Sequence, residues 1–229
     1  MIPIRDSVPS RYFPLVTVFL IAVNLGIFVM EWAILEPSFA KAFFSYYALV
    51  PGDLVARWSY EPLLTLSSFL TYQFLHGSWF HVIANMWSLW LFGDNVEDQM
   101  GPIAFLMFYL VCGVVAAVTH ILIFPESQLP VVGASGAVSG VMGAYMFLYP
   151  TARLVFLFPV LIFPVFIEIF AIMYFLFWFL GQFFSGTVIL SQGSGAEVGG
   201  VAFWAHIGGF LAGLFTHRFF LNRRQSFGR

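Results

Sequence analysis

Charged residues are scarce in this chain of 229 residues: they make up 9% of it, against 61% hydrophobic residues and a mean hydropathy of +0.92. Soluble domains carry about 25% charged residues, so this chain cannot cover itself with a surface that faces water. A soluble cytosolic enzyme is therefore excluded. The net charge of -2, without a basic tract, excludes a nucleic-acid partner. The single cysteine, Cys112, excludes an internal disulfide framework and a cysteine-based zinc site, and we expect neither a metal nor a cofactor.

Long apolar runs are abundant instead, and they predict an all-α membrane protein made of one domain over residues 1–229. A helix needs about 20 residues to cross a bilayer. We expect six spans, at about 14–35, 77–93, 102–124, 134–149, 160–184 and 200–220. The segment 36–75, which contains several charged residues, forms a large loop. Pro159 and Pro164 predict an irregular or interfacial entry into the fifth span, because proline interrupts a helix.

The distribution of lysine and arginine predicts the orientation of these spans, because cytoplasmic loops carry an excess of both. If the N-terminus lies inside, the outer loops hold only Lys41 and Arg57. The inner side then holds Arg5, Arg11, Arg153, Arg218, Arg223, Arg224 and Arg229. Both termini are therefore expected to be cytoplasmic. The short termini indicate a prokaryotic protein of the cell inner membrane.

Polar side chains inside membrane spans are costly, and each marks a candidate functional site. Four such residues stand out: His81 and Asn85 in the second span, Ser135 at the start of the fourth and His206 in the sixth. With a rise of about 1.5 Å per residue, all four lie roughly 6–12 Å below the outer boundary. Three separate helices thus bring a serine, two histidines and an asparagine to one depth.

Small residues recur every four positions next to two of these candidates. The fourth span carries Gly136 with Gly140, and Ser139 with Gly143; the sixth carries Ala205, Gly209 and Gly213. Such stripes let helix backbones approach closely in lipid. Simple packing is the alternative explanation for the glycines alone. Packing of stripe on stripe would also bring the Ser135 hydroxyl and the His206 imidazole together.

A serine within hydrogen-bond reach of a histidine is an activated nucleophile, because the imidazole removes the hydroxyl proton. The backbone N–H of Ser135 at a helix start, with His81 and Asn85 one turn apart on one helix face, can stabilise an oxyanion. No carboxylate is placed to orient His206, which favours a dyad over a triad. Ser139, one turn deeper, is the rival nucleophile.

These residues resemble the motifs of the rhomboid intramembrane serine proteases, in the right order over nearly the whole chain. Gly133-Ala134-Ser135-Gly136 resembles GxSG, and Ala205-His206 with Gly209 and Gly213 resembles AHxxGxxxG. His76, His81 and Asn85 resemble the second-helix H-x4-H-x3-N signature, and Gly93 to Gly101 with Glu97 resembles the turn that follows it. One departure is Ser67-Ser68, which stands where many members carry a Trp-Arg pair that anchors the first loop.

The resemblance implies a six-helix rhomboid-like bundle with Ser135 as nucleophile, His206 as base, and His81 and Asn85 as oxyanion donors. It also implies an endopeptidase that cuts single-pass membrane proteins in or next to their transmembrane helix within the lipid bilayer. A structural role is favoured for His76, for Glu97 at its turn and for Glu168 in the fifth span.

Two other functions compete with proteolysis. A non-catalytic rhomboid-like chaperone would bind transmembrane helices, but the intact serine and histidine argue against it. A small transporter would need a path of polar residues across the membrane, and here they stop at one depth. Zinc and aspartyl intramembrane proteases are disfavoured, because the chain lacks H-E-x-x-H and a pair of intramembrane aspartates.

Overall fold

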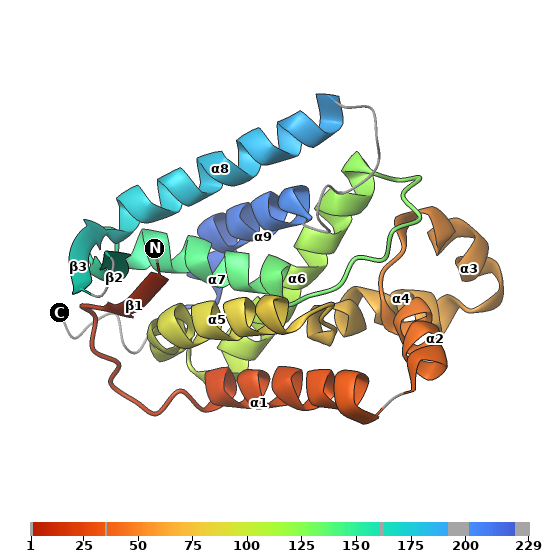
Figure 1. Ribbon diagram of the computed structural model, residues 1–229, viewed down its shortest axis with the longest axis horizontal. Helices are drawn as coiled ribbons and strands as arrows, with labels where there is room; N and C mark the ends of the chain where they lie inside the picture. The colour runs from red at the N-terminus through yellow and green to blue at the C-terminus, as the bar shows by residue number, and fades with distance from the viewer. Residues whose placement is uncertain (1, 35, 161–162, 192–201, 223–229) are drawn as a thin grey trace.

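The computed structural model describes residues 2–34, 36–160, 163–191 and 202–222, and it is mostly helical (Figure 1). Helix α7 packs against α9, and α6 packs against both, at the centre of the bundle. Helices α8 and α1 lie at opposite edges (Figure 1). The bundle helices are α1 (Leu15–Val29), α5 (Trp79–Met100), α6 (Pro102–Ile123), α7 (Ser135–Leu148), α8 (Ala171–Ser191) and α9 (Phe203–Thr216), with a π-helical turn η1 (Met30–Ile34) after α1.

Three stretches of helix among the described residues are long and apolar enough to cross a membrane: Leu15–Trp32, Pro102–Ile123 and Ala171–Ser191. Together with the hydropathy of the chain, they make this a membrane-embedded protein. Helices α7 and α9 have 14 residues each, which corresponds to about 21 Å at 1.5 Å per residue. They are shorter than a hydrocarbon core of about 30 Å, so their ends lie within the bundle.

The prediction of an all-α fold is wrong at residues 2–6, 153–160 and 163–170, which form an antiparallel three-stranded sheet. Its strands are β1 (Ile2–Asp6), β2 (Arg153–Val160) and β3 (Phe163–Phe170), in the order β1-β2-β3. The sequence of β2 and β3 is rich in β-branched and aromatic residues, which favour strands. The prolines, which pair at Pro159↔Pro164, disfavour a helix there.

The start of the fifth predicted span, at residue 160, is also wrong, since α8 begins at Ala171 after the hairpin. Glu168 therefore lies on β3 instead of inside a span. Its carboxylate pairs with the guanidinium of Arg153 at 3.0 Å, and both side chains are more than half exposed. Open sheet edges are not tolerated in hydrocarbon, so we infer that the sheet lies outside the apolar core of the membrane.

The segment predicted as a large loop contains three short helices at the end of the bundle opposite the sheet (Figure 1). They are α2 (Pro37–Tyr47), α3 (Leu54–Tyr60) and α4 (Pro62–Thr71), with 3-10 turns η2 (Pro51–Asp53) and η3 (Tyr72–Phe74); a last 3-10 turn, η5 (His217–Phe219), follows α9. The N-terminal strand and this loop thus lie at opposite ends of the bundle, an arrangement that the predicted orientation requires.

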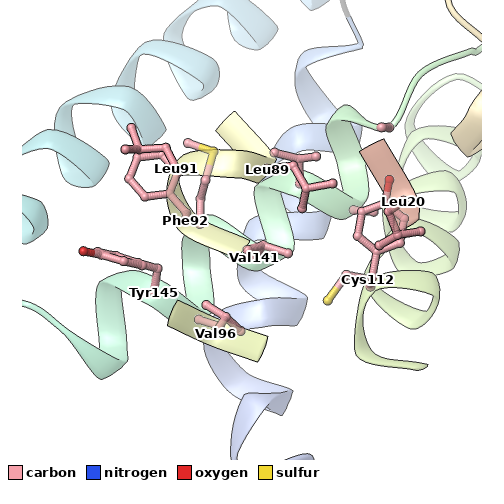
Figure 2. Close-up of a cluster of buried hydrophobic side chains, with 14 of the residues drawn as sticks. Leu20, Leu89, Leu91, Phe92, Val96, Cys112, Val141 and Tyr145 are labelled. Atoms are coloured by element: carbon pink, nitrogen blue, oxygen red, sulfur yellow. The ribbon is translucent and has the colours of Figure 1, made fainter. Parts of the chain in front are cut away.

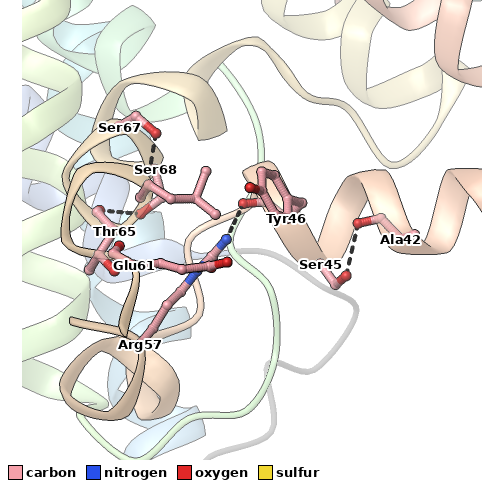
Figure 3. Close-up of polar contacts among 9 residues, drawn as sticks. Ala42, Ser45, Tyr46, Arg57, Glu61, Thr65, Ser67 and Ser68 are labelled. Atoms are coloured by element: carbon pink, nitrogen blue, oxygen red, sulfur yellow. Dashed lines mark hydrogen bonds and ion pairs between the residues drawn. The ribbon is translucent and has the colours of Figure 1, made fainter. Parts of the chain in front are cut away.

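Arg57 ties these short helices together (Figure 3). Its guanidinium donates to the carbonyl of Tyr46 at 2.6 Å and lies 3.5 Å from the carboxylate of Glu61. Ser67 and Ser68, which replace the Trp-Arg pair, bond within α4 to the carbonyls of Leu64 and Thr65. The two serines thus form hydrogen bonds within their own helix. The hydrogen bond that links α3 to α2 comes from Arg57.

A buried apolar cluster joins α1, α5, α6 and α7 (Figure 2). Its members interdigitate where the four helices meet, and Leu20, Leu89, Val96, Cys112, Val141 and Tyr145 among them are inaccessible to solvent or nearly so. Phe92 stacks edge to face on Tyr145 with ring centroids 5.1 Å apart. This cluster fixes the positions of α5 and α7 relative to each other, and both carry candidate site residues.

Helix α5 continues seven residues past the predicted end of the second span at 93, so the predicted turn from Gly93 to Gly101 is helical as far as Met100. Gly101, with φ of 79°, ends the helix, and Pro102 begins α6. The extension places the Glu97 carboxylate at the start of α1. It accepts hydrogen bonds from the N–H groups of Val16 and Thr17, at 2.9 and 2.8 Å, and from the Thr17 hydroxyl at 2.8 Å. Glu97 is therefore a helix cap supplied from a distant helix.

We expect Glu97→Ala to destabilise the fold by roughly 2–4 kcal/mol, because it leaves two buried N–H groups and a hydroxyl without an acceptor. The measurement is thermal or denaturant unfolding of the purified protein in detergent. Glu36→Gln, at an exposed position before α2, is the matched control. Equal stability of the two variants would contradict the capping role.

Candidate active site

The structure brings the Ser135 hydroxyl and the His206 imidazole into direct contact. Ser135 is the first residue of α7, and His206 lies in the first turn of α9. The distance between His206 Nε2 and Ser135 Oγ is 2.8 Å. Both side chains are partly exposed. The pair is therefore assembled and reachable from outside the protein.

Glycines along α7 and α9 allow this contact. A Cβ on Gly209 would overlap the carbonyl oxygen of Gly136, and a Cβ on Gly213 would overlap that of Gly140. A Cβ on Gly143 would overlap the carbonyl oxygen of Phe210. The two helices thus touch backbone to backbone over three turns, as small-residue stripes permit. Larger residues at these positions would move His206 away from Ser135.

The local fold leaves the backbone N–H of Ser135 in an open first turn. The first hydrogen bond of the helix runs from the N–H of Val138 to the carbonyl of Ala134, at 2.9 Å. N–H groups that precede it have no partner within the helix and carry the positive end of its dipole. The preceding loop is held in place by the N–H of Gly133, which donates to the carbonyl of Tyr72 at 2.9 Å.

His81 and Asn85 face Gly133, two residues before Ser135. Gly133 has φ of 120°, and a Cβ there would lie 2.6 Å from His81 Nε2 and 3.6 Å from Asn85 Nδ2. Gly133 is thus required both by its backbone conformation and by the close approach of these side chains. The two side chains and the start of α7 surround one small region.

His76 contacts Asn85 rather than Ser135. Its Nε2 lies 3.0 Å from Asn85 Nδ2. An amide nitrogen only donates, so His76 accepts through Nε2 and Asn85 keeps a second amide hydrogen for another acceptor. The backbone N–H of His76 in turn donates to Glu31 on η1, at 3.4 Å. His76 therefore orients Asn85.

Sequence reasoning missed two residues of this site, both on α8. The Oε1 atom of Gln182 lies 2.7 Å from His206 Nδ1. The ring of Trp178 lies over the His206 ring, with centroids 6.2 Å apart and an interplanar angle of 31°. Gln182 carried a signal: α8 contains no other amide side chain and no aspartate, glutamate, histidine, lysine or arginine. The prediction of a dyad considered only a carboxylate as the partner of His206, whereas the partner here is an amide.

The remaining candidates either lie away from the serine–histidine pair or form hydrogen bonds with backbone groups. The hydroxyl of Ser139 is buried and donates to the carbonyl of Ser135 at 2.6 Å, so it is occupied within α7. Glu97 caps α1, and Glu168 pairs with Arg153 on the sheet. Within the described residues, no three histidine, cysteine or acidic side chains are grouped to hold a metal ion.

This arrangement contains the parts of nucleophilic catalysis at a carbonyl carbon. Nε2 can take the proton of the Ser135 hydroxyl, and the N–H at the start of α7 can stabilise an oxyanion. Asn85 Nδ2 is a further donor beside Gly133, and His81 Nε2 is another when it carries the ring hydrogen. The chemistry that this geometry allows is acyl transfer by a serine.

Comparison with known proteins agrees with these observations. A model of the Rhomboid domain family matches residues 64–223. The chain is 28% identical over 157 residues to Rhomboid protein 1, mitochondrial, of Saccharomyces cerevisiae, covering 66% of this chain and 43% of the relative. It is 29% identical over 141 residues to the human Presenilin-associated rhomboid-like protein, mitochondrial, covering 61% of this chain and 34% of the relative. It is also 29% identical over 147 residues to Rhomboid protease GluP of Bacillus subtilis, covering 64% of this chain and 24% of the relative.

The matched part thus spans less than half the length of each of these relatives. The relatives come from mitochondria, a chloroplast and a bacterium. Similarity therefore supports an embedding in a membrane, and it gives no support to the prediction of a prokaryotic inner membrane.

We expect Gly213→Ala to separate α7 from α9, because the added methyl group meets the Gly140 backbone, which cannot rotate away. The cost should be about 1–3 kcal/mol or more. Unfolding in detergent measures it. The matched control is Gly26→Ala on α1, where no atom lies within 4 Å of the new methyl group. It should be neutral or stabilising by up to about 1 kcal/mol, since alanine favours a helix over glycine. Similar losses in both variants would contradict backbone-to-backbone packing of α7 on α9.

Proposed function

Because the chain belongs to the rhomboid family, we propose that it is an intramembrane serine protease. It hydrolyses a peptide bond in or next to the transmembrane helix of single-pass membrane proteins. The observation that supports this most directly is the 2.8 Å contact between His206 Nε2 and Ser135 Oγ. A family member that only binds transmembrane helices would not need this contact.

In the proposed reaction, His206 Nε2 removes the proton of the Ser135 hydroxyl as Oγ attacks the carbonyl carbon of the scissile bond. The same proton then passes from Nε2 to the leaving amine. Water then attacks the acyl-enzyme while His206 Nε2 takes one of its protons. Nε2 returns this proton to Ser135 Oγ as the acyl bond breaks, and the second product leaves as a carboxylic acid that ionises in water. The imidazole is thus the group that carries protons between Ser135, the leaving amine and water.

The oxyanion of each tetrahedral intermediate is proposed to bind beside Gly133. Three donors converge there: the N–H of Ser135, the His81 ring and the free amide hydrogen of Asn85. Donors placed in advance cost no reorganisation during the reaction, and each is typically worth 10²–10³-fold in rate. The contact of Asn85 with His76 holds the amide in place.

The proposed membrane arrangement has six spans, cytoplasmic termini and an active site that opens toward the side of α2–α4. The short helix α7 begins below the membrane surface, so Ser135 is reached through a hydrated pocket. A substrate helix must unwind there before its amides become accessible. Substrates should therefore carry helix-destabilising residues at the cut.

Ser135→Ala and His206→Ala are each expected to abolish cleavage of a single-pass reporter by the purified protein in liposomes, because each removes one partner of the proton transfer. The matched control is Ser139→Ala, one turn along the same helix, which should retain activity within a few fold. Cleavage by Ser135→Ala would overturn the assignment. If the wild type cleaved none of a varied set of reporters but bound them, the chaperone function would be favoured.

His81→Ala and Asn85→Ala are expected to lower kcat by about 10- to 1,000-fold with little change in KM, since their donors act on the intermediate. Steady-state kinetics on the same reporter measures this. Ser88→Ala is the control on α5, because its hydroxyl donates only to the carbonyl of Ala84. An unchanged kcat in both variants would show that the oxyanion binds elsewhere.

A further inference from the structure

One face of α8 packs on α9, and Gln182 lies in the middle of that face. Trp178, Gln182 and Gly186 follow one another at intervals of four residues, which places them in a line along the helix. Trp178 covers the His206 ring on one side of Gln182. On the other side, Trp204 Nε1 donates to the carbonyl of Gly186 at 3.3 Å. Contacts on both sides therefore fix Gln182 opposite His206.

The hydrogen bond between Gln182 and His206 determines which ring nitrogen carries the proton. The amide oxygen Oε1 accepts and never donates, so its 2.7 Å partner Nδ1 must be the protonated nitrogen. Nε2 of the neutral ring then has a free lone pair. That lone pair faces the Ser135 hydroxyl at 2.8 Å. The opposite tautomer would place a hydrogen on Nε2 and could not accept the serine proton.

The cost of placing an amide on this helix supports a specific role for Gln182. α8 is apolar and lies at the edge of the bundle (Figure 1), and few of its residues are buried. A polar group in such surroundings is costly unless it is hydrogen-bonded. The described partner of the Gln182 side chain is His206. The hydrogen bond to the imidazole is therefore the described contact that offsets the cost of placing this amide on α8.

We propose that Gln182 is a positioning residue that holds the His206 ring and its Nδ1–H tautomer, and so completes a Ser135–His206–Gln182 triad. This inference rests on the proposed protease function. Gln182 takes no proton in the reaction: the proton of Ser135 moves to Nε2, and the Nδ1 proton stays on the ring. A neutral amide orients the base, whereas a carboxylate would also stabilise the imidazolium by its charge.

The test compares three variants of the full chain in liposomes. Gln182→Met has a similar length but no amide. We expect its kcat to fall by about 10- to 1,000-fold with KM nearly unchanged, because Gln182 acts only through the general base, whose own contribution is about 10²–10⁴-fold. Gln182→Glu restores an acceptor and should recover much of kcat, with the acid limb of the pH–rate profile moved to higher pH. Thr187→Val is the control on α8, because its hydroxyl donates to the carbonyl of Phe184.

A second measurement is independent of peptide cleavage. ¹⁵N NMR of the histidine rings, with His206 assigned from the His206→Gln spectrum, should show the Nδ1–H tautomer in the wild type and its partial loss in Gln182→Met. Wild-type kcat and pH profile in Gln182→Met, or an Nε2–H tautomer in the wild type, would overturn the role of Gln182. Absence of cleavage by the wild type would instead overturn the protease function, and the NMR result would still decide the tautomer.

Discussion

The site depends on the direct backbone-to-backbone contact between α7 and α9, which glycines allow. Ser135 and His206 are 71 positions apart in the sequence, and neither side chain is long. They meet only because glycines bring the two helix axes closer than any other residue would allow. The position of Ser135 at the start of α7 opposite His206 in the first turn of α9 follows from where these two short helices touch.

Around this contact, two polar side chains of the bundle pair with partners from distant parts of the chain. Glu97 on α5 caps α1, and Gln182 on α8 bonds His206 on α9. Bulk water does not supply hydrogen bonds within the apolar core of a bilayer, so a buried polar side chain needs a partner in the protein, and for these two side chains it comes from another element. The same bonds that stabilise the bundle thereby determine the orientation of the catalytic groups.

The β-hairpin before α8 shows where pattern reasoning reaches its limit. Residues 154–167 form a continuous apolar run in the sequence, and such a run does not distinguish a buried helix from a pair of strands. The two prolines predicted an irregular entry to α8, but strand pairing with β1 depends on residues 150 positions earlier in the chain. The end of α5 was also misplaced, because the stretch from Gly93 to Gly101 resembles a turn in sequence, whereas the Glu97 carboxylate within it has its partners on α1.

The sequence by itself determined that the chain is embedded in a membrane. It also determined the candidate residues Ser135, His206, His81 and Asn85. Charge content, the expected depth of a residue in its span and the spacing of small residues can all be read along the chain. The sequence also pointed to close packing of the two glycine stripes. Only the tertiary structure decided that an amide on α8 faces His206, that His76 holds Asn85 and that Glu97 caps α1. Each of these contacts joins residues from different elements, and a hydrogen-bond partner across a fold has no fixed spacing along the chain.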